Sequence, residues 1–78
     1  MKREIEGTIV SSQIEHYGDN DIPTGIVTIR APDKEYYKFE ININTECETV
    51  KEDAKVHVIY EPILDSKTLR ALKIEKAD

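Results

Sequence analysis

The 78-residue sequence has one cysteine, no tryptophan, one phenylalanine and three residues each of glycine and proline. A single cysteine, Cys47, excludes an internal disulfide framework and is consistent with a reducing compartment. The apolar runs are too short for a transmembrane helix, and the first residues lack the apolar segment of a signal peptide. We therefore expect a cytoplasmic protein.

Positive charge is also scarce, because 11 lysine and arginine residues stand against 16 aspartate and glutamate residues, for a net charge of −5. The acidic excess lies in residues 13–24 and 46–66, whereas residues 67–78 are net positive. Long-range repulsion therefore opposes nucleic acid, and only a local cationic patch would attract it.

Apolar residues make up 38% of the chain and charged residues 35%, and the apolar ones are mostly isoleucine and valine in patterned runs. Such patterning argues for a folded protein over a disordered one. Residues 1–78 are expected to form one domain, with a total stability of roughly 4–12 kcal/mol.

The clearest pattern is a hairpin in residues 25–43, GIVTIRAPDKEYYKFEINI. Alternate residues are apolar in both halves, which indicates two strands that each bury one face. Aligning these faces places Ile29 opposite Tyr37 and leaves residues 32–34 as a three-residue loop. Lys34 must then adopt a left-handed conformation at a cost of about 1 kcal/mol, so a five-residue loop is the alternative.

Three further strands are expected, two of them with a shift in apolar parity. In residues 3–14 the shift predicts a β-bulge near Ile9 and Val10, with two short strands as the alternative. Residues 55–60 alternate regularly. In residues 68–76 a second shift, between Ala71 and Leu72, predicts another bulge, with a helix as the alternative.

Two polar segments connect these strands. Residues 15–25 are rich in glycine, aspartate and asparagine and predict a loop. In residues 45–55, Thr49 and Glu52 have the spacing of a capping box, which predicts a short helical turn.

Five short strands, two of them bent, favour a closed barrel, because an open sheet would leave one apolar face uncovered. This order resembles the OB-fold, a five-stranded Greek-key barrel. The resemblance is best in TVKEDAKVHVIYEPI and RALKI, where Asp53 stands at a position that is glycine in many small OB domains. The predicted fold is all-β, a small five-stranded Greek-key (OB-like) barrel with a short helical turn between the third and fourth strands, and an SH3-like barrel is the alternative.

The candidate ligand-binding residues lie on the polar face of the hairpin. The register sets Arg30 opposite Tyr36 and Thr28 opposite Lys38, with Ile26 below them. The OB resemblance implies binding there, because OB domains stack bases on aromatic rings and hold phosphates with cations. An ordinary solvated sheet surface explains the same residues equally well.

No catalytic or metal-binding motif is recognisable. Cys47 and His57 are the only candidate nucleophile and base, and the sequence indicates neither a third group nor an oxyanion hole. The acidic run at residues 19–21 lacks the calcium-loop spacing. We expect no enzymatic activity, no metal and no cofactor.

The sequence thus predicts a small binding module. Its negative charge favours a protein partner or a second copy of the chain, with Ile26 and Ile59 facing outward as interface candidates. Single-stranded nucleic acid on Arg30, Tyr36 and Lys38 is the alternative, and no membrane partner is expected.

Overall fold

The computed structural model describes residues 2–18, 22–63 and 67–77. Within these ranges, no helix has the length and apolar character needed to cross a membrane. The elements are β1 (Arg3–Tyr17), β2 (Ile22–Arg30), β3 (Tyr36–Ile41), β4 (Glu46–Cys47), β5 (Lys55–Pro62) and β6 (Leu69–Lys76).

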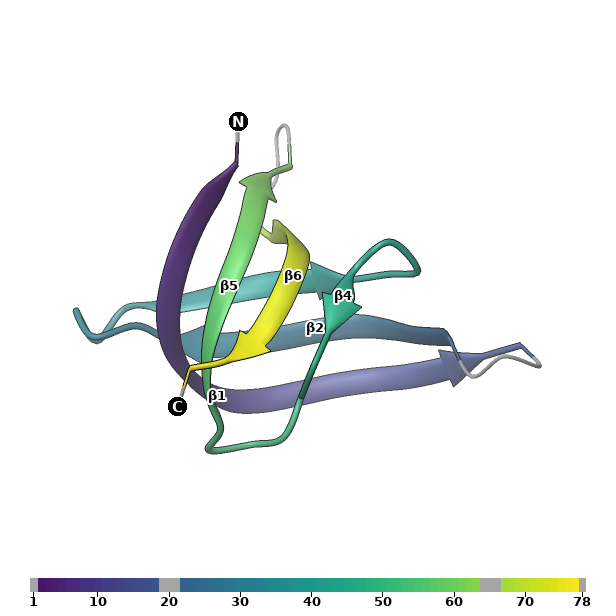
Figure 1. The fold of residues 1–78 in the computed structure, drawn as a ribbon, viewed down its shortest axis with the longest axis horizontal. Coiled ribbons are helices and arrows are strands. Elements are labelled where there is room, and N and C mark those ends of the chain that lie inside the picture. Colours follow the sequence, from purple (N-terminus) through teal and green to yellow (C-terminus); the bar gives the residue numbers. More distant parts are fainter. Residues whose placement is uncertain (1, 19–21, 64–66, 78) are drawn as a thin grey trace.

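The strands close into a small barrel (Figure 1). β1, β2 and β3 form an antiparallel meander, the first half of β1 pairs with β5, and β5 pairs with β6. Parallel pairing of β6 with β3, through Phe39–Leu69 and Glu40–Arg70, completes the circle. The two-residue β4 adds to β6 in parallel. These pairings confirm the predicted all-β, closed five-stranded barrel.

β1 takes part in both halves of the barrel because it bends at a bulge. Thr8 and Ile9 pair with β2 in one register and Ser11 in another, which leaves Val10 as the extra residue that the sequence predicts. A Cβ atom at Gly7 would lie 2.5 Å from a carbonyl oxygen of β2. Only glycine lets the two backbones approach this closely beside the bend.

β6 is a strand with a bulge of its own. Lys73 pairs with Ile59 and Ala71 with Tyr60, so Leu72 is the extra residue. The bulge lies where the apolar parity shifts in the sequence, and the alternative helix is wrong. Bending β6 at this point lets it contact β5 along its length and β3 at its start.

The hairpin of β2 and β3 has the predicted register, with Ile29 opposite Tyr37. The Ala31 nitrogen donates to the Glu35 oxygen over 2.9 Å, which closes the three-residue loop. Lys34 has a φ of 70°, the left-handed conformation that this loop requires. β3 ends two residues earlier than the sequence pattern suggests, and residues 42–45 form a turn.

The core fills the barrel interior with side chains from all strands except β4. Phe39 lies at its centre and meets the Tyr60 ring edge to face, with 5.2 Å between centroids. Such an arrangement adds about 0.5–1.5 kcal/mol to the area buried. The core residues are Ile9, Val27, Ile29, Phe39, Ile41, Val56, Val58, Tyr60, Ala71 and Ile74.

The expected loop over residues 15–25 is largely wrong. β1 continues to Tyr17, β2 begins at Ile22, and the two strands stay paired from Ile14–Gly25 to Tyr17–Ile22. They form an arm that extends beyond the barrel (Figure 1). Continuous pairing with β1 overrides the local turn composition, and residues 19–21 lie outside the described part.

The short helical turn expected before β5 is a single hydrogen-bonded turn. The Ala54 nitrogen donates to the Lys51 oxygen over 3.2 Å, and Asp53 has a φ of 70°. Thr49 Oγ1 accepts its hydrogen bond from the Lys51 nitrogen, two residues on, in place of a capping box. A left-handed residue ends a helix at once, so the chain turns directly into β5.

Gly25 provides the first test of this packing. A Cβ atom there would lie 2.0 Å from the Gln13 carbonyl oxygen, so Gly25→Ala should separate β1 from β2. We expect urea denaturation to show a loss of about 1–3 kcal/mol or more. Gly18→Ala is the matched control, because no atom lies within 4 Å of its Cβ and only its φ of +76° opposes alanine. Equal losses in the two variants would contradict the close approach.

Candidate functional site

The outer face of β2 and β3 carries the predicted binding residues. Arg30 lies opposite Tyr36 and Thr28 opposite Lys38, as the hairpin register predicts. The Tyr36 side chain is 63% exposed, and both cations are exposed as well. The fold therefore presents an accessible ring between two cations on one surface.

The same face continues onto β1 with uncharged polar residues. Thr8 pairs with Arg30 and Ser11 with Thr28. Gln13 pairs with Ile26. Hydroxyl and amide groups are donors and acceptors that suit a polar ligand. No sequence pattern indicates this extension, because the register of β1 against β2 depends on the bulge.

Ile26 belongs to this face but is not an exposed anchor. It pairs with Glu40 on one side, and both side chains are half-buried. Ile59, the other predicted outward residue, is also half-buried. Both isoleucines thus lie on the outward side of their strands, as predicted, but neither is fully exposed. The exposed large apolar residues of the described part are Val10, Tyr36 and Ile43.

Tyr37, next to Tyr36, lies on the inner face. Its ring packs near Phe39, with centroids 6.5 Å apart. The nearby Asp33 carboxylate, with burial as a smaller cause, raises the pKa of Tyr37. The neutral phenol is therefore favoured. Tyr37 is half-buried against the core and Phe39 is fully buried, so Tyr36 is the most exposed aromatic residue of this hairpin.

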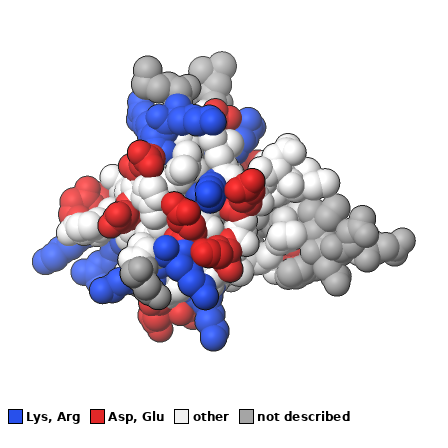
Figure 2. Space-filling model, viewed as in Figure 1, with Lys and Arg blue, Asp and Glu red and all other residues white. Residues whose placement is uncertain are grey.

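Charge pairing differs between the two sides of the barrel. Arg70 pairs with Glu61 at 3.8 Å and Lys73 with Glu75 at 3.6 Å, both on the side of β5 and β6. Figure 2, which views that side, shows acidic side chains over the middle of the face and basic ones mostly at its margins. Within the described part of the chain, nine lysine and arginine side chains have no ion-pair partner: Lys2, Arg3, Arg30, Lys34, Lys38, Lys51, Lys55, Lys67 and Lys76.

A groove of 520 Å³ adjoins the outer face of β2 and β3 at its Arg30 end. It lies between the β1 bulge, the β2–β3 loop and the start of β5. Three cations line it, Arg30, Lys34 and Lys55, and none of them has an ion-pair partner in the described residues. The lining residues are Glu6, Gly7, Thr8, Val10, Arg30, Ala31, Pro32, Lys34, Asp53, Lys55, Val56 and Ala77.

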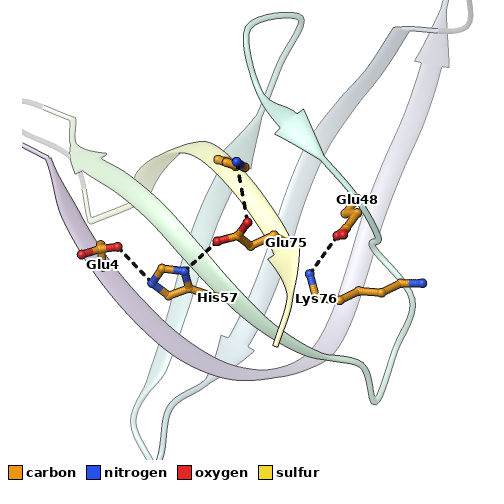
Figure 3. A network of polar contacts seen from close by, with 6 residues as sticks. Glu4, Glu48, His57, Glu75 and Lys76 are labelled. Carbon is orange, nitrogen blue, oxygen red and sulfur yellow. Dashed lines mark hydrogen bonds and ion pairs between the residues drawn. The ribbon is translucent and has the colours of Figure 1, made fainter. Parts of the chain in front are cut away.

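On the other side of the barrel, His57 is held between two carboxylates (Figure 3). Its Nε2 lies 3.2 Å from Glu4 of β1, and its Nδ1 lies 3.0 Å from Glu75 of β6. A neutral imidazole has one N–H, so only the imidazolium donates to both. The hydrogen bond that His57 donates to the Glu75 carboxylate is the main reason that the pKa of His57 is raised, and the same bond lowers the pKa of Glu75.

His57 and Cys47 do not form a catalytic pair in this structure. Both ring nitrogens of His57 contact carboxylates, and the Cys47 Sγ donates to the Thr49 oxygen over 3.4 Å. Partial burial raises the pKa of Cys47, which disfavours the reactive thiolate. In residues 2–18, 22–63 and 67–77, no group of three or more acidic, histidine or cysteine side chains is arranged to hold a metal ion.

The comparisons with known proteins add no identity. No family model matches the chain, and neither the curated proteins nor the solved structures give a match. The candidate site therefore rests on its own geometry.

The histidine contact predicts a pH-dependent contribution to stability. Because the folded state raises the pKa of His57 above its ordinary 6.5, its contribution is complete below that pH and is lost as the pH rises through the folded value. Urea unfolding of wild type and His57→Gln should therefore differ more at about pH 5.5 than at about pH 8.5.

Nuclear magnetic resonance titration of the His57 ring gives the direct check. Glu75→Gln should bring the pKa of His57 down toward its ordinary value, whereas Glu52→Gln, on an exposed turn residue, should leave it unchanged. A wild-type pKa at or below 6.5 would contradict the two-carboxylate contact.

Proposed function

We propose that this protein is a small, non-enzymatic OB-like binding module whose ligand lies on the outer face of β2 and β3. One observation carries the proposal: Arg30 and Lys38, without ion-pair partners in the described part, flank the exposed ring of Tyr36. The ligand that suits this arrangement best is single-stranded nucleic acid. Its bases stack on aromatic rings and its phosphates pair with cations.

The strand order supports the OB-like assignment. After the meander of β1, β2 and β3, the chain crosses over so that β5 pairs with β1 and β6 lies between β5 and β3. A Greek-key barrel of five strands with a bent first strand is the OB plan, and its second and third strands form the ligand face. A fold alone does not determine function, so the side chains of that face decide the proposal.

The net charge of −5 limits the affinity that we expect. Acidic groups elsewhere repel a phosphate backbone at long range, but salt screens this repulsion beyond about 10 Å at 0.1 M. Contacts on the face itself are short-ranged. We therefore propose weak, sequence-tolerant binding that depends on stacking as well as on charge.

A fluorescence titration with short single-stranded DNA and RNA, at low and moderate salt, tests this function. Tyr36→Ala should weaken binding by about tenfold or more, because stacking contributes about 1–3 kcal/mol per base. Ile43→Ala is the matched control, since Ile43 is 69% exposed but lies in the turn after β3. No salt-sensitive binding by the wild type, or unchanged binding by Tyr36→Ala, would rule out the proposed ligand.

A protein partner or a second copy of the chain is the second candidate. The exposed side chains of Tyr36 and Ile43 favour it, because both can be buried in an interface, and so does the net negative charge. The half-buried state of Ile26 and Ile59 makes a protein partner less favoured than a nucleic-acid ligand, because neither side chain offers a fully exposed apolar contact. A cytoplasmic location, consistent with the single free thiol of Cys47, is part of the same proposal.

The mass of the protein in solution tests self-association. Light scattering over a range of concentrations should show a dimer that Tyr36→Ala or Ile43→Ala disrupts, if either residue lies in the interface. A strict monomer that also retains no protein from the source cell would count against this second candidate.

A further inference from the structure

The groove beside the β1 bulge has features of a ligand site that the β2–β3 face does not share. Cations from three separate segments line it: Arg30 from the end of β2, Lys34 from the following loop and Lys55 from the start of β5. None of the three pairs with a carboxylate within the described part of the chain. On the opposite side of the barrel, Arg70 and Lys73 of β6 have acidic partners, whereas Lys76 at the end of the same strand has no ion pair in the described residues.

We propose that this groove is a phosphodiester-binding subsite. It receives single-stranded nucleic acid at the point where the ligand leaves the β2–β3 face. The inference rests on the proposed function and adds a second contact region to it. Three unpaired cations around one concave surface attract an anion more strongly than the same charges on a flat sheet, because the groove walls exclude part of the screening water.

Two carboxylates narrow the choice of anion. Glu6 and Asp53 also line the groove, so three cations against two carboxylates leave a net charge of +1. This balance suits the single charge of a phosphodiester better than the several charges of a free nucleoside triphosphate. Apolar lining from Val10 and Pro32 offers a surface for the sugar next to the phosphate.

Arg30 connects the groove to the β2–β3 face, because it lines the groove and also pairs with Tyr36. Tyr36 and Lys38 are two residues apart on β3, so their side chains lie on the same face about 7 Å from each other. A single-stranded nucleic acid whose base stacks on Tyr36 would therefore pass Arg30. It would then reach Lys34 and Lys55 as it turns around the end of the hairpin. The order of contacts is Lys38, Arg30 with Tyr36, and then the two groove lysines.

The salt dependence of binding tests the subsite. The double variant Lys34→Gln with Lys55→Gln should bind a nucleic-acid strand of about twelve nucleotides more weakly. It should also reduce the slope of log affinity against log salt by about 0.7, the change expected when one phosphate contact is lost. A strand of about four nucleotides, which the sheet face alone accommodates, should be far less affected.

The matched control is Lys2→Gln with Lys67→Gln, which removes the same charge from two exposed residues. Lys2 precedes the end of β1 that pairs with Tyr60, and Lys67 precedes the start of β6, whereas Lys55 lies at the opposite end of β5. This control should leave the slope unchanged. Tyr36→Ala should lower the affinity without changing the slope.

Each outcome decides a separate point. If the groove variant and the control have the same slope while Tyr36→Ala still weakens binding, the subsite is wrong and the proposed function stands. If the wild type binds no strand of either length, both are wrong. A reduced slope confined to the groove variant and the longer strand supports the subsite.

Discussion

The barrel depends on one pair of backbone hydrogen bonds at the β1 bulge. The Ile9 nitrogen donates to the Ala54 oxygen over 3.0 Å, and the Asp53 nitrogen donates to the Ile9 oxygen over 2.7 Å. These bonds hold the turn before β5 against the point where β1 bends. Without the bend, one strand could not pair with β2 along its second half and with β5 along its first. Because the side chain of Ile9 is itself fully buried, the same residue fixes the backbone path and fills the core.

The barrel is closed between β3 and β6 by a much shorter stretch of strand pairing. Two residue pairs join β3 to β6, and the buried ring of Phe39 lies directly at this seam. Two pairs of backbone contacts are a weak connection by themselves, so packing of Phe39 against Tyr60 and the neighbouring aliphatic residues must supply most of the free energy that keeps the barrel closed. The same β3–β6 pairing places Glu40 beside Arg70. The edge of the β2–β3 face therefore lies next to the ion pair that Arg70 forms with Glu61.

Sequence periodicity predicted the local geometry well and the non-local geometry poorly. The register of the hairpin followed from matching two apolar faces across residues 32–34, and both bulges followed from shifts in parity at Val10 and Leu72. These signals lie within one strand or one hairpin. The contact of His57 with Glu4 and Glu75 joins three strands far apart in the sequence, and nothing in the spacing of these residues indicates it. The same holds for the arm, since residues 15–17 extend β1 only because residues 22–24 pair with them.

The distribution of charge partners bears on where a ligand can bind. Desolvating a cation that already pairs with a carboxylate also removes a favourable contact, so an ion-paired surface gains little from a new anion. On the β5–β6 side, Lys73 and Arg70 are in that situation. At the hairpin end, an anion meets cations without such partners in the described residues and loses no internal ion pair when it binds. The protein is acidic overall, yet Lys34, Lys38 and Lys55 lie around Arg30 without ion-pair partners in the described residues, which is the condition that the proposed anion site requires.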